Sequence, residues 1–412
     1  MPTLASHKTC TACMGCMNVC PKGAIGKIQY PDGHFGIRVD MNLCIECGGC
    51  ERVCPIVNGS NYGEMSRPRL TYAAWAENPE VRHRGATSGI FGALAHKMIK
   101  AKGGCVAGVV MSGLTCRYIL TDDIYIVGQM QGSKYTSSQP DYIYKEILGE
   151  LRKGRDVLFC GLPCHVAALL SYIPKPLQER LIAIDIICGG VSSPLLIKRF
   201  AEEKNDVKSI RSFRNKDEGW RSQGFRYNLK YLSKDDEIIS EKRGVRNLVT
   251  DGFACELTDR FSCYDCRMAF PSRKSDLTIG DLWGDQDFPE QHFEGISSII
   301  AHSEKGKNFI KEAGIILNPI DPVKVLKPNS RIFNGKSIKQ YFPERRMLAR
   351  GLQDWDYPTL MKVYASDLRA RNLLWMPFAA YRLASFKLAE LVRKLQNKKL
   401  LSKILASKEI IR

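Results

Sequence analysis

The sequence predicts a small α+β module, an α/β core and a basic helical tail, on three observations. One cysteine pattern occurs twice within the first sixty residues, around two short extended stretches. Further along, apolar runs with strand character alternate with segments of helical spacing. Beyond residue 365 the chain is rich in lysine, arginine and leucine. We therefore divide it into residues 1–60, two parts of one core at 66–180 and 181–365, and the tail at 366–412.

The composition suits a globular protein with metal or redox sites. Hydrophobic residues make up 44% of the 412 residues, and no run of eighteen apolar residues could span a membrane. The first ten residues lack the apolar segment of a signal peptide, so we expect the reducing cytoplasm. Sixteen cysteines in a protein of a reducing compartment indicate metal or redox chemistry. The formal charge of +18 comes with no nucleic-acid-binding motif, and we expect no nucleic-acid partner.

The duplicated pattern has the form Cys-x2-Cys-x2-Cys-x3-Cys-Pro and ends at Pro21 and at Pro55. This is the spacing of two-cluster bacterial ferredoxins, in which three cysteines of one copy and the fourth of the other hold each [4Fe–4S] cluster. The rule predicts one cluster on Cys10, Cys13, Cys16 and Cys54 and a second on Cys44, Cys47, Cys50 and Cys20.

Disulfides and zinc are the alternative interpretations of these cysteines. Disulfides would need an oxidising compartment, and zinc is usually held by two pairs of ligands without an extra crossing cysteine. The duplication favours clusters. Between the copies, residues 27–39 predict two short strands around a Pro31-Asp32-Gly33 turn, and residues 58–69 predict a linker. Two clusters conduct electrons and catalyse nothing, so the rest of the chain should be what they serve.

Alternating patterns indicate that the core is α/β. We expect strands at 70–76, 105–111, 124–127, 157–159 and 181–187. Helices are expected within 82–103, at 140–152, at 166–172 and after Pro194. Residues 208–250 change pattern and predict a hairpin around 233–236.

Six stretches of the core resemble the beta subunit of coenzyme F420-reducing hydrogenase and its relatives, a family that includes F420-linked formate dehydrogenase beta subunits and chlorophyllide-type reductases. They are GATSGIFGALAHKMI (85–99), GSKYTSS (132–138), VLFCGLPCHVAAL (157–169), IDIICGGVSSP (184–194), CYDC (263–266) and SDLTIGDLWG (275–284). They follow the family's order across residues 66–330, and an N-terminal ferredoxin pair is a common attachment in that family. The chain departs at Ile90, where the family often has a second glycine.

The resemblance implies an α+β ferredoxin-like N-terminal module fused to an α/β flavin-binding core, with the basic helical tail added. Members of the family carry FAD and an iron–sulfur cluster, and they move electrons between clusters and an organic hydride acceptor or donor. Coenzyme F420 is the best-known such partner. The expected protein partner is a redox partner protein or ferredoxin.

A third [4Fe–4S] cluster is implied by cysteines in the family's positions. These are Cys164, Cys188, Cys263 and Cys266. Two of them follow predicted strands, where thiolates would gather at one edge of a parallel sheet. Alternatively, Cys160 replaces one of the four, Cys255 is a weaker substitute, and Cys188 is an ordinary buried cysteine. We interpret Cys105 and Cys116 as structural.

FAD would need backbone N–H groups or hydroxyls around its pyrophosphate, often where a helix begins. The sequence offers glycines and hydroxyls at 85–89 and a polar turn at 132–138. The candidate contacts are Thr87, Ser88, Gly89, Gly132, Ser133, Lys134, Tyr135, Ser137 and Ser138. An ordinary helix cap and a surface turn are the alternative, since neither stretch is a dinucleotide fingerprint.

Three further residues near the cysteines are candidates for supporting roles. His165 is a weak candidate for a catalytic proton donor, and more often such a histidine is structural. Asp281 and Trp283 lie in a motif that the family places near its cluster, so they are expected to support that site from behind the ligands.

The tail suits a helix on an anionic membrane. Residues 367–412 contain eleven Lys/Arg and three acidic residues, interleaved with leucines and aromatic residues. A helix packed on the body of the protein or on a partner is the equal alternative. A membrane contact would place the protein at the inner face of the membrane.

These patterns predict an iron–sulfur flavoprotein oxidoreductase. Two alternatives remain open: a non-catalytic electron-transfer subunit docked on another protein, and a reductase of a specific biosynthetic intermediate at the membrane surface. The substrate, the direction of electron flow and the oligomeric state have no signature in the sequence.

Overall fold

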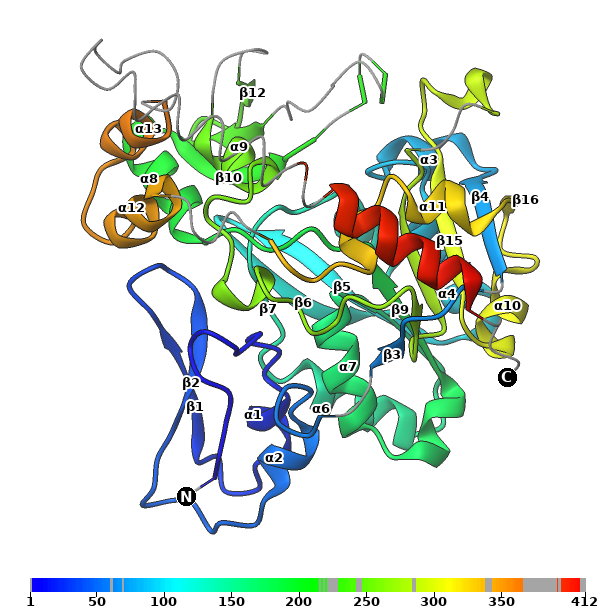
Figure 1. Cartoon of the computed structure of the whole chain (residues 1–412), viewed down its shortest axis with the longest axis horizontal. Helices are drawn as coiled ribbons and strands as arrows, with labels where there is room; N and C mark the ends of the chain where they lie inside the picture. The colour runs from blue at the N-terminus through cyan, green and yellow to red at the C-terminus, as the bar shows by residue number, and fades with distance from the viewer. Residues whose placement is uncertain are drawn as a thin grey trace.

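The computed structural model describes residues 2–59, 62–68, 70–214, 216–217, 219–220, 229–241, 247–283, 287–337, 343–365, 391 and 394–407. Within these residues, a nine-stranded mixed sheet forms the centre of the protein (Figure 1). Its strand order is β16 (Ile315–Pro319), β4 (Leu70–Ala76), β15 (Ser297–Ala301), β14 (Leu277–Asp281), β9 (Leu181–Ile186), β8 (Val157–Gly161), β5 (Cys105–Ser112), β6 (Thr115–Thr121) and β7 (Ser138–Gln139).

The four middle strands β14, β9, β8 and β5 are parallel, as the alternating sequence pattern predicts. On both sides the sheet continues with antiparallel pairs, β14 with β15 and β5 with β6. Because parallel strands share the direction of their carboxyl ends, the segments that follow β8, β9 and β14 emerge at one edge. The predicted third-cluster cysteines Cys164 and Cys188 follow β8 and β9 there.

Successive residues of the central strands point into two separate cores. In β8, Leu158 packs on one side of the sheet, whereas Val157 and Phe159 pack on the other, and all three are buried. The first side is covered by α4 (Ile90–Lys102), α5 (Ile124–Met130) and α10 (Glu304–Ile310). The second is covered by α6 (Ile143–Arg152) and α7 (Pro163–Tyr172).

The N-terminal module is built from α1 (Gly15–Val19), the hairpin β1 (Ile25–Gln29) and β2 (Phe35–Val39), and α2 (Gly49–Val53). The antiparallel hairpin confirms the two predicted strands. The helices α1 and α2 both contact α7, so the module is docked on the second side of the sheet (Figure 1). Beyond it, β3 (Gly63–Glu64) pairs with β13 (Ser272–Arg273).

A smaller unit lies beside the sheet and has its own core. It contains α8 (Leu195–Lys204), β10 (Val207–Ser212), β11 (Lys230–Ser233), β12 (Ile238–Ser240), α9 (Leu248–Ala254), α12 (Pro343–Gly351) and α13 (Tyr357–Ala365). The pairing of β11 with β12 confirms the hairpin expected around 233–236. Residues 221–228 and 242–246 of that prediction lie outside the described residues. Two short helices, α3 (Pro79–Arg84) and α11 (Pro322–Leu326), flank β4.

The strand expected at 124–127 is wrong, because this segment begins helix α5. Its β-branched residues suggested a strand, but the side chain of Asp123 accepts a hydrogen bond from the backbone N–H of Tyr125 and caps the helix. Val127 is completely buried against the sheet. Local capping and tertiary packing therefore override the strand propensity.

Only part of the tail falls within the described residues. Residues 394–406 are helical, and Ile404 is buried with Trp75 and Val325 in a core beside β4 (red helix in Figure 1). The backbone N–H of Arg67 donates to the hydroxyl of Ser407 at 3.1 Å. The described end of the tail thus packs on the body of the protein, whereas residues 366–390 lie outside the described residues. Among the described residues, no helix is long and apolar enough to cross a membrane.

Candidate functional site

The two cysteine copies share one backbone geometry. Two positions in each copy have left-handed φ angles. They are Ala12 (50°) and Met14 (58°) in the first copy, and the corresponding Glu46 (52°) and Gly48 (67°) in the second. Non-glycine residues rarely adopt this conformation, so its recurrence at two non-adjacent positions in each copy is specific. Short helices, α1 and α2, follow in each copy.

The first predicted set of thiols is brought together, including the crossing cysteine. Burial is the main cause that raises the pKa of the Cys13 thiol to about 12, and the neighbouring Cys54 and Cys10 contribute to this rise. Burial also raises the pKa of Cys16, with contributions from Cys13, Cys10 and Cys54. The backbone N–H of Ala12 donates to the sulfur of Cys10 at 3.4 Å. The four ligands predicted for the first cluster therefore lie within electrostatic reach of one another.

The second predicted set lines one small pocket. Cys20, Cys44, Cys47 and Cys50 all contribute to it. Cys47 is exposed and Cys44 is half-buried, whereas none of the four thiols in the first set is exposed. The second site is therefore the one nearer to solvent.

The third predicted set also gathers in one pocket, lined by Cys164, Cys188, Cys263 and Cys266. Burial raises the pKa of the Cys164 thiol, and nearby thiolates raise it further, among them that of Cys13 in the first set. Thr11, between Cys10 and Cys13, also lines the third pocket, so the first and third sites are neighbours. Cys160, the proposed substitute, does not line this pocket.

A buried thiolate requires a compensating cation, and iron supplies it when a cluster binds. Among the described residues, no three His, Cys, Asp or Glu side chains are placed to hold a single metal ion. A cube does not require such convergence, because each thiolate binds a different iron. The three sets of four thiols suit [4Fe–4S] clusters, and their ligation remains a prediction.

Three arginines that the sequence analysis missed line the third pocket, namely Arg260, Arg273 and Arg331. Arg260 donates to the hydroxyl of Ser137 at 2.6 Å, and Arg331 donates to the backbone carbonyl of Cys263 at 2.6 Å. A cluster with four thiolates carries a net negative charge, which such guanidinium groups would stabilise. Arg260 lies only three positions before Cys263, and a search for cations beside the cysteines could have found it.

Most of the predicted FAD residues line one cavity of about 550 Å³, a volume within the range of about 300–1,000 Å³ that is usual for ligand sites. They are Thr87, Ser88, Gly89, Gly132, Ser133, Lys134, Tyr135 and Ser138. Ser137 is the exception and faces the third thiol pocket. Gly89 has a φ of +77° at the start of α4 and caps it without a side-chain hydrogen bond. The free N–H groups of that first turn suit a pyrophosphate.

Two side chains of this cavity form hydrogen bonds within the protein that the sequence did not reveal. The hydroxyl of Ser88 donates to the carbonyl of Ala74 at 2.8 Å and accepts from the N–H of Ser297 at 3.1 Å. The ammonium of Lys134 donates to four carbonyls at the end of α5, including that of Met130 at 2.7 Å. Burial lowers the pKa of Lys134 to about 8. These two groups shape the cavity and are not free donors to a ligand.

Aromatic and charged side chains complete the cavity. The rings of Tyr135 and Phe253 stack with their centroids 4.1 Å apart, and Trp283 lies at the rim with 38% of its surface exposed. Arg214 pairs with the carboxylate of Asp281 at 2.8 Å. Asp281 and Trp283 therefore line the cavity itself, which is closer to a ligand than the supporting position predicted for them.

The cavity and the third thiol pocket share a wall. Leu162, Cys188, Gly190 and Val191 line both. Gly190 has a φ of +139°, and a Cβ atom there would lie 2.1 Å from a carboxylate oxygen of Asp259, so only glycine fits this close approach. Redox groups placed in the two spaces would therefore lie on opposite sides of these shared residues. Cys160 lines the cavity side.

His165 lines the third thiol pocket and does not line the 550 Å³ cavity. Its Nδ1 forms a hydrogen bond of 2.9 Å with the hydroxyl of Tyr118, and burial is the main cause that lowers its pKa to about 3. The ring is therefore neutral, which weakens its candidacy as a proton donor. Tyr118 itself lines the cavity.

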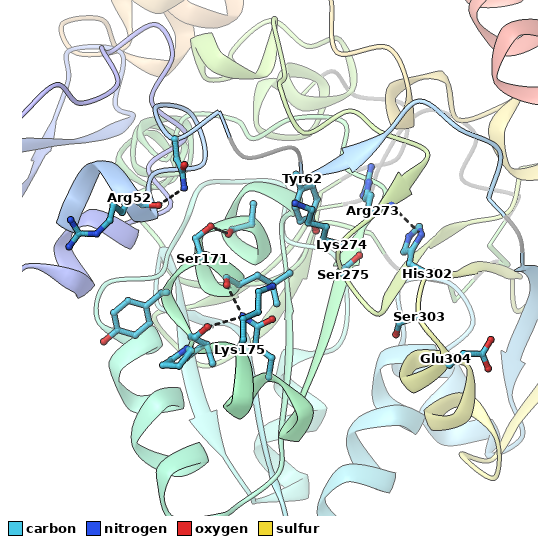
Figure 2. Close-up of a pocket in the computed structure, with 17 residues that line it drawn as sticks. Arg52, Tyr62, Ser171, Lys175, Arg273, Lys274, Ser275, His302, Ser303 and Glu304 are labelled. Carbon is cyan, nitrogen blue, oxygen red and sulfur yellow. Dashed lines mark hydrogen bonds between the residues drawn. The ribbon is translucent and has the colours of Figure 1, made fainter. Parts of the chain in front are cut away.

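A second cavity, of about 860 Å³, lies between the N-terminal module and the core (Figure 2). Arg52, Tyr62, Lys175, Arg273 and His302 are among its lining residues. It contains no cysteine and none of the predicted FAD residues. We therefore assign neither a cluster nor FAD to it, although it is the larger space.

Comparisons with known proteins agree with these features. Residues 154–317 match the family described as the C terminus of the beta subunit of coenzyme F420 hydrogenase/dehydrogenase, and residues 9–57 match the 4Fe-4S dicluster domain. Over 191 residues the chain is 28% identical to a subunit of the F420H2 dehydrogenase of Methanosarcina mazei. The matched stretch covers 44% of this chain and 54% of the relative, so the chain spans about half the length of that relative.

A solved chain of the F420-reducing [NiFe] hydrogenase complex from Methanosarcina barkeri is also similar. It has 14% sequence identity and a TM-score of 0.43, over 72% of this chain and 92% of that chain. The resemblance stated from the sequence is confirmed: residues 154–317 match the coenzyme F420 hydrogenase/dehydrogenase beta-subunit family and residues 9–57 match a 4Fe-4S dicluster domain, which supports iron–sulfur clusters in the N-terminal region.

Proposed function

We propose that the protein is an FAD-dependent iron–sulfur oxidoreductase that exchanges electrons between its N-terminal clusters and an organic hydride carrier. The observation that carries the proposal is the wall shared by the 550 Å³ cavity and the pocket of Cys164, Cys188, Cys263 and Cys266. The first thiol set lies next to that pocket, through Cys13 and Cys164. Under this proposal, electrons would pass between the three thiol sets and the cavity along this series of neighbouring sites.

Bound in the cavity, FAD would supply the conversion between single-electron and hydride chemistry. The N-terminal turn of α4 would hold its pyrophosphate, and the stacked rings of Tyr135 and Phe253 offer a flat apolar face. Trp283 at the rim would exclude water and contact the incoming carrier. The relative from Methanosarcina mazei is named for F420H2, so a deazaflavin is the first carrier to test.

The test is turnover by anaerobically purified protein. We expect a flavin released by acid, and reduction of a deazaflavin when dithionite supplies electrons. Flavin content is measured by absorbance, and deazaflavin reduction by loss of its visible band. Protein with no flavin, and no uptake of added FAD, would rule out the proposal.

A non-catalytic electron-transfer subunit is the second candidate, because a solvent-facing second thiol set suits contact with another protein. It predicts cluster reduction without turnover of any organic carrier. A reductase of a biosynthetic intermediate predicts turnover of a substrate other than a deazaflavin. Membrane contact stays a prediction for the tail, where Leu391 and Leu395 are one helical turn apart and more than half exposed.

A further inference from the structure

We infer that the loop around the second thiol set is a docking surface for a protein that carries single electrons. The surface consists of Met41, Leu43 and Ile45, which are 43%, 50% and 56% exposed. It flanks Cys44 and leads to the exposed Cys47. This inference rests on the proposed function, because it needs a redox group on the second set.

The apolar character of this loop is concentrated. Thirteen large hydrophobic residues among those described are exposed, and three of them fall within five consecutive positions here. Isolated exposed apolar side chains are ordinary, but a cluster beside a functional group marks an interaction site. The charged neighbours along the chain, Arg38, Asp40 and Glu46, nearly cancel.

The duplicated fold supplies an internal comparison. His7, Thr9 and Thr11 stand at the corresponding positions of the first copy, and that loop is already docked on a protein surface. The hydroxyl of Ser262 donates to the carbonyl of Cys10 at 3.1 Å, and the rings of His7 and Phe261 are 5.3 Å apart. The first copy thus presents its cluster loop to the core of the same chain.

The second copy presents the same loop geometry outward. Ala12 and Met14 of the first copy are 3% and 1% exposed, whereas their counterparts Glu46 and Gly48 are not buried. The loop of the first copy therefore faces the core of the same chain, whereas the loop of the second copy exposes three apolar residues to solvent. Electron transfer requires the two redox groups to approach closely, so a carrier protein must cover this loop. One electron passes, and no covalent bond forms or breaks.

The occupant to which we commit is a small carrier with an apolar rim around its own redox centre. Apolar docking predicts affinity that changes little with salt, because screening acts on charges. A second copy of this chain is the competing occupant. It would give a dimer that the same substitutions dissociate.

The experiment compares the double variant Leu43→Ser/Ile45→Ser with Ile238→Ser, a control residue that is 64% exposed on β12. Binding of an oxidised two-cluster bacterial ferredoxin to the immobilised holoprotein is measured directly. We expect the double variant to raise Kd at least tenfold, the control to leave it unchanged, and the wild-type Kd to vary less than twofold with added salt. Reduction by dithionite should be equal in all three proteins.

Leu43 and Ile45 flank a cysteine, so iron content is measured for each variant. If the double variant loses iron, ferredoxin binding is measured with Met41→Ser instead, because Met41 is three positions from Cys44. Three outcomes would contradict the proposed docking surface. They are unchanged ferredoxin affinity in an iron-replete variant, ferredoxin binding that depends strongly on salt, and a dimer of this chain that the substitutions dissociate. If dithionite does not reduce a flavin in the wild-type protein, the proposed function is refuted, whereas the measured ferredoxin binding remains valid.

Discussion

Tyr62, in the segment that joins the N-terminal module to the core, donates its hydroxyl to the buried carboxylate of Asp185 in β9. The same carboxylate accepts from Arg273 at 2.8 Å and from Thr278 at 2.5 Å. Both Tyr62 and Asp185 are almost completely buried. The linker predicted from polar and glycine-rich sequence is therefore fastened to the middle of the sheet, which holds the module in a fixed position relative to the core.

Removing this hydroxyl should destabilise the attachment of the module. We expect Tyr62→Phe to lower the free energy of unfolding by about 2 kcal/mol, because a buried carboxylate loses one of its donors. Anaerobic thermal denaturation of the holoprotein measures the change. Tyr125→Phe is the control, since that side chain is 72% exposed and should change stability by less than about 0.5 kcal/mol. Equal effects of the two substitutions would contradict the role of the hydrogen bond.

Iron content tests the three thiol sets. Three [4Fe–4S] clusters correspond to about twelve iron atoms per chain. We expect Cys263→Ser to retain about eight, because the third pocket loses a ligand. Cys160→Ser should retain the full content, since its side chain lines the other cavity. Wild-type protein with about eight iron atoms, or equal loss in both variants, would remove the third cluster or the ligand assignment.

The two ends of α4 allow a matched test of FAD binding. Gly89 and Gly103 both have left-handed φ angles, +77° and +59°, and they flank the same helix. Alanine costs strain at either position, but only at Gly89 would its Cβ lie 2.6 Å from the carbonyl of Val81, beside the cavity.

We therefore expect Gly89→Ala to weaken FAD binding at least tenfold and Gly103→Ala to leave it near the wild-type level. Quenching of FAD fluorescence during titration of the flavin-depleted protein measures the affinity. The thermal midpoint of each variant reports the strain separately. Similar FAD affinities in the two variants would argue against a cofactor at the start of α4.

The tail should contribute to stability through its buried residue. We expect Ile404→Ala to cost about 2–4 kcal/mol, because this side chain is 1% exposed in the core beside β4. Leu395→Ala in the same helix should cost little, since Leu395 is 59% exposed. Thermal denaturation compares the two.

Membrane contact of the tail predicts a different dependence. Full-length protein should sediment with anionic vesicles, less so as salt is added, and Leu391→Ser/Leu395→Ser should reduce the salt-resistant part. The comparison is with neutral vesicles and with the unsubstituted chain. Equal sedimentation with both kinds of vesicle would contradict the membrane prediction. The role of this segment would then be its packing on the body of the protein.

Local sequence was sufficient where one short segment supplies both the residues and the geometry. The cysteine spacing predicted the two N-terminal groups of four thiols that the fold brings together, whereas the third group was implied by the family resemblance. The strand after Asp156 and the helix at Ile143 appeared where the pattern placed them. It failed at Ile124, where a capping carboxylate decides between helix and strand.

The roles of Ser88, Lys134 and Arg260 could not be predicted, because their partners are distant or are backbone carbonyls. Ser88 bonds to Ser297, and Arg260 bonds to Ser137 and to the carbonyl of Phe35. Such pairs are set by how the sheet folds back on itself, which no spacing along the chain encodes. Hydroxyls and cations near a glycine-rich turn therefore look alike in sequence, whether they bind a ligand or hold the wall.

The wall between the third thiol pocket and the 550 Å³ cavity separates two kinds of residue. Trp283 and Phe253 line the cavity and not the thiol pocket, so a substitution at either would change the shape of the cavity without replacing a residue of the pocket. Residues on the pocket side of the wall are tied to the thiols and to Arg331. Under the proposed function, substitutions at the mouth of the cavity would therefore change which organic carrier fits and leave the thiol sets in place.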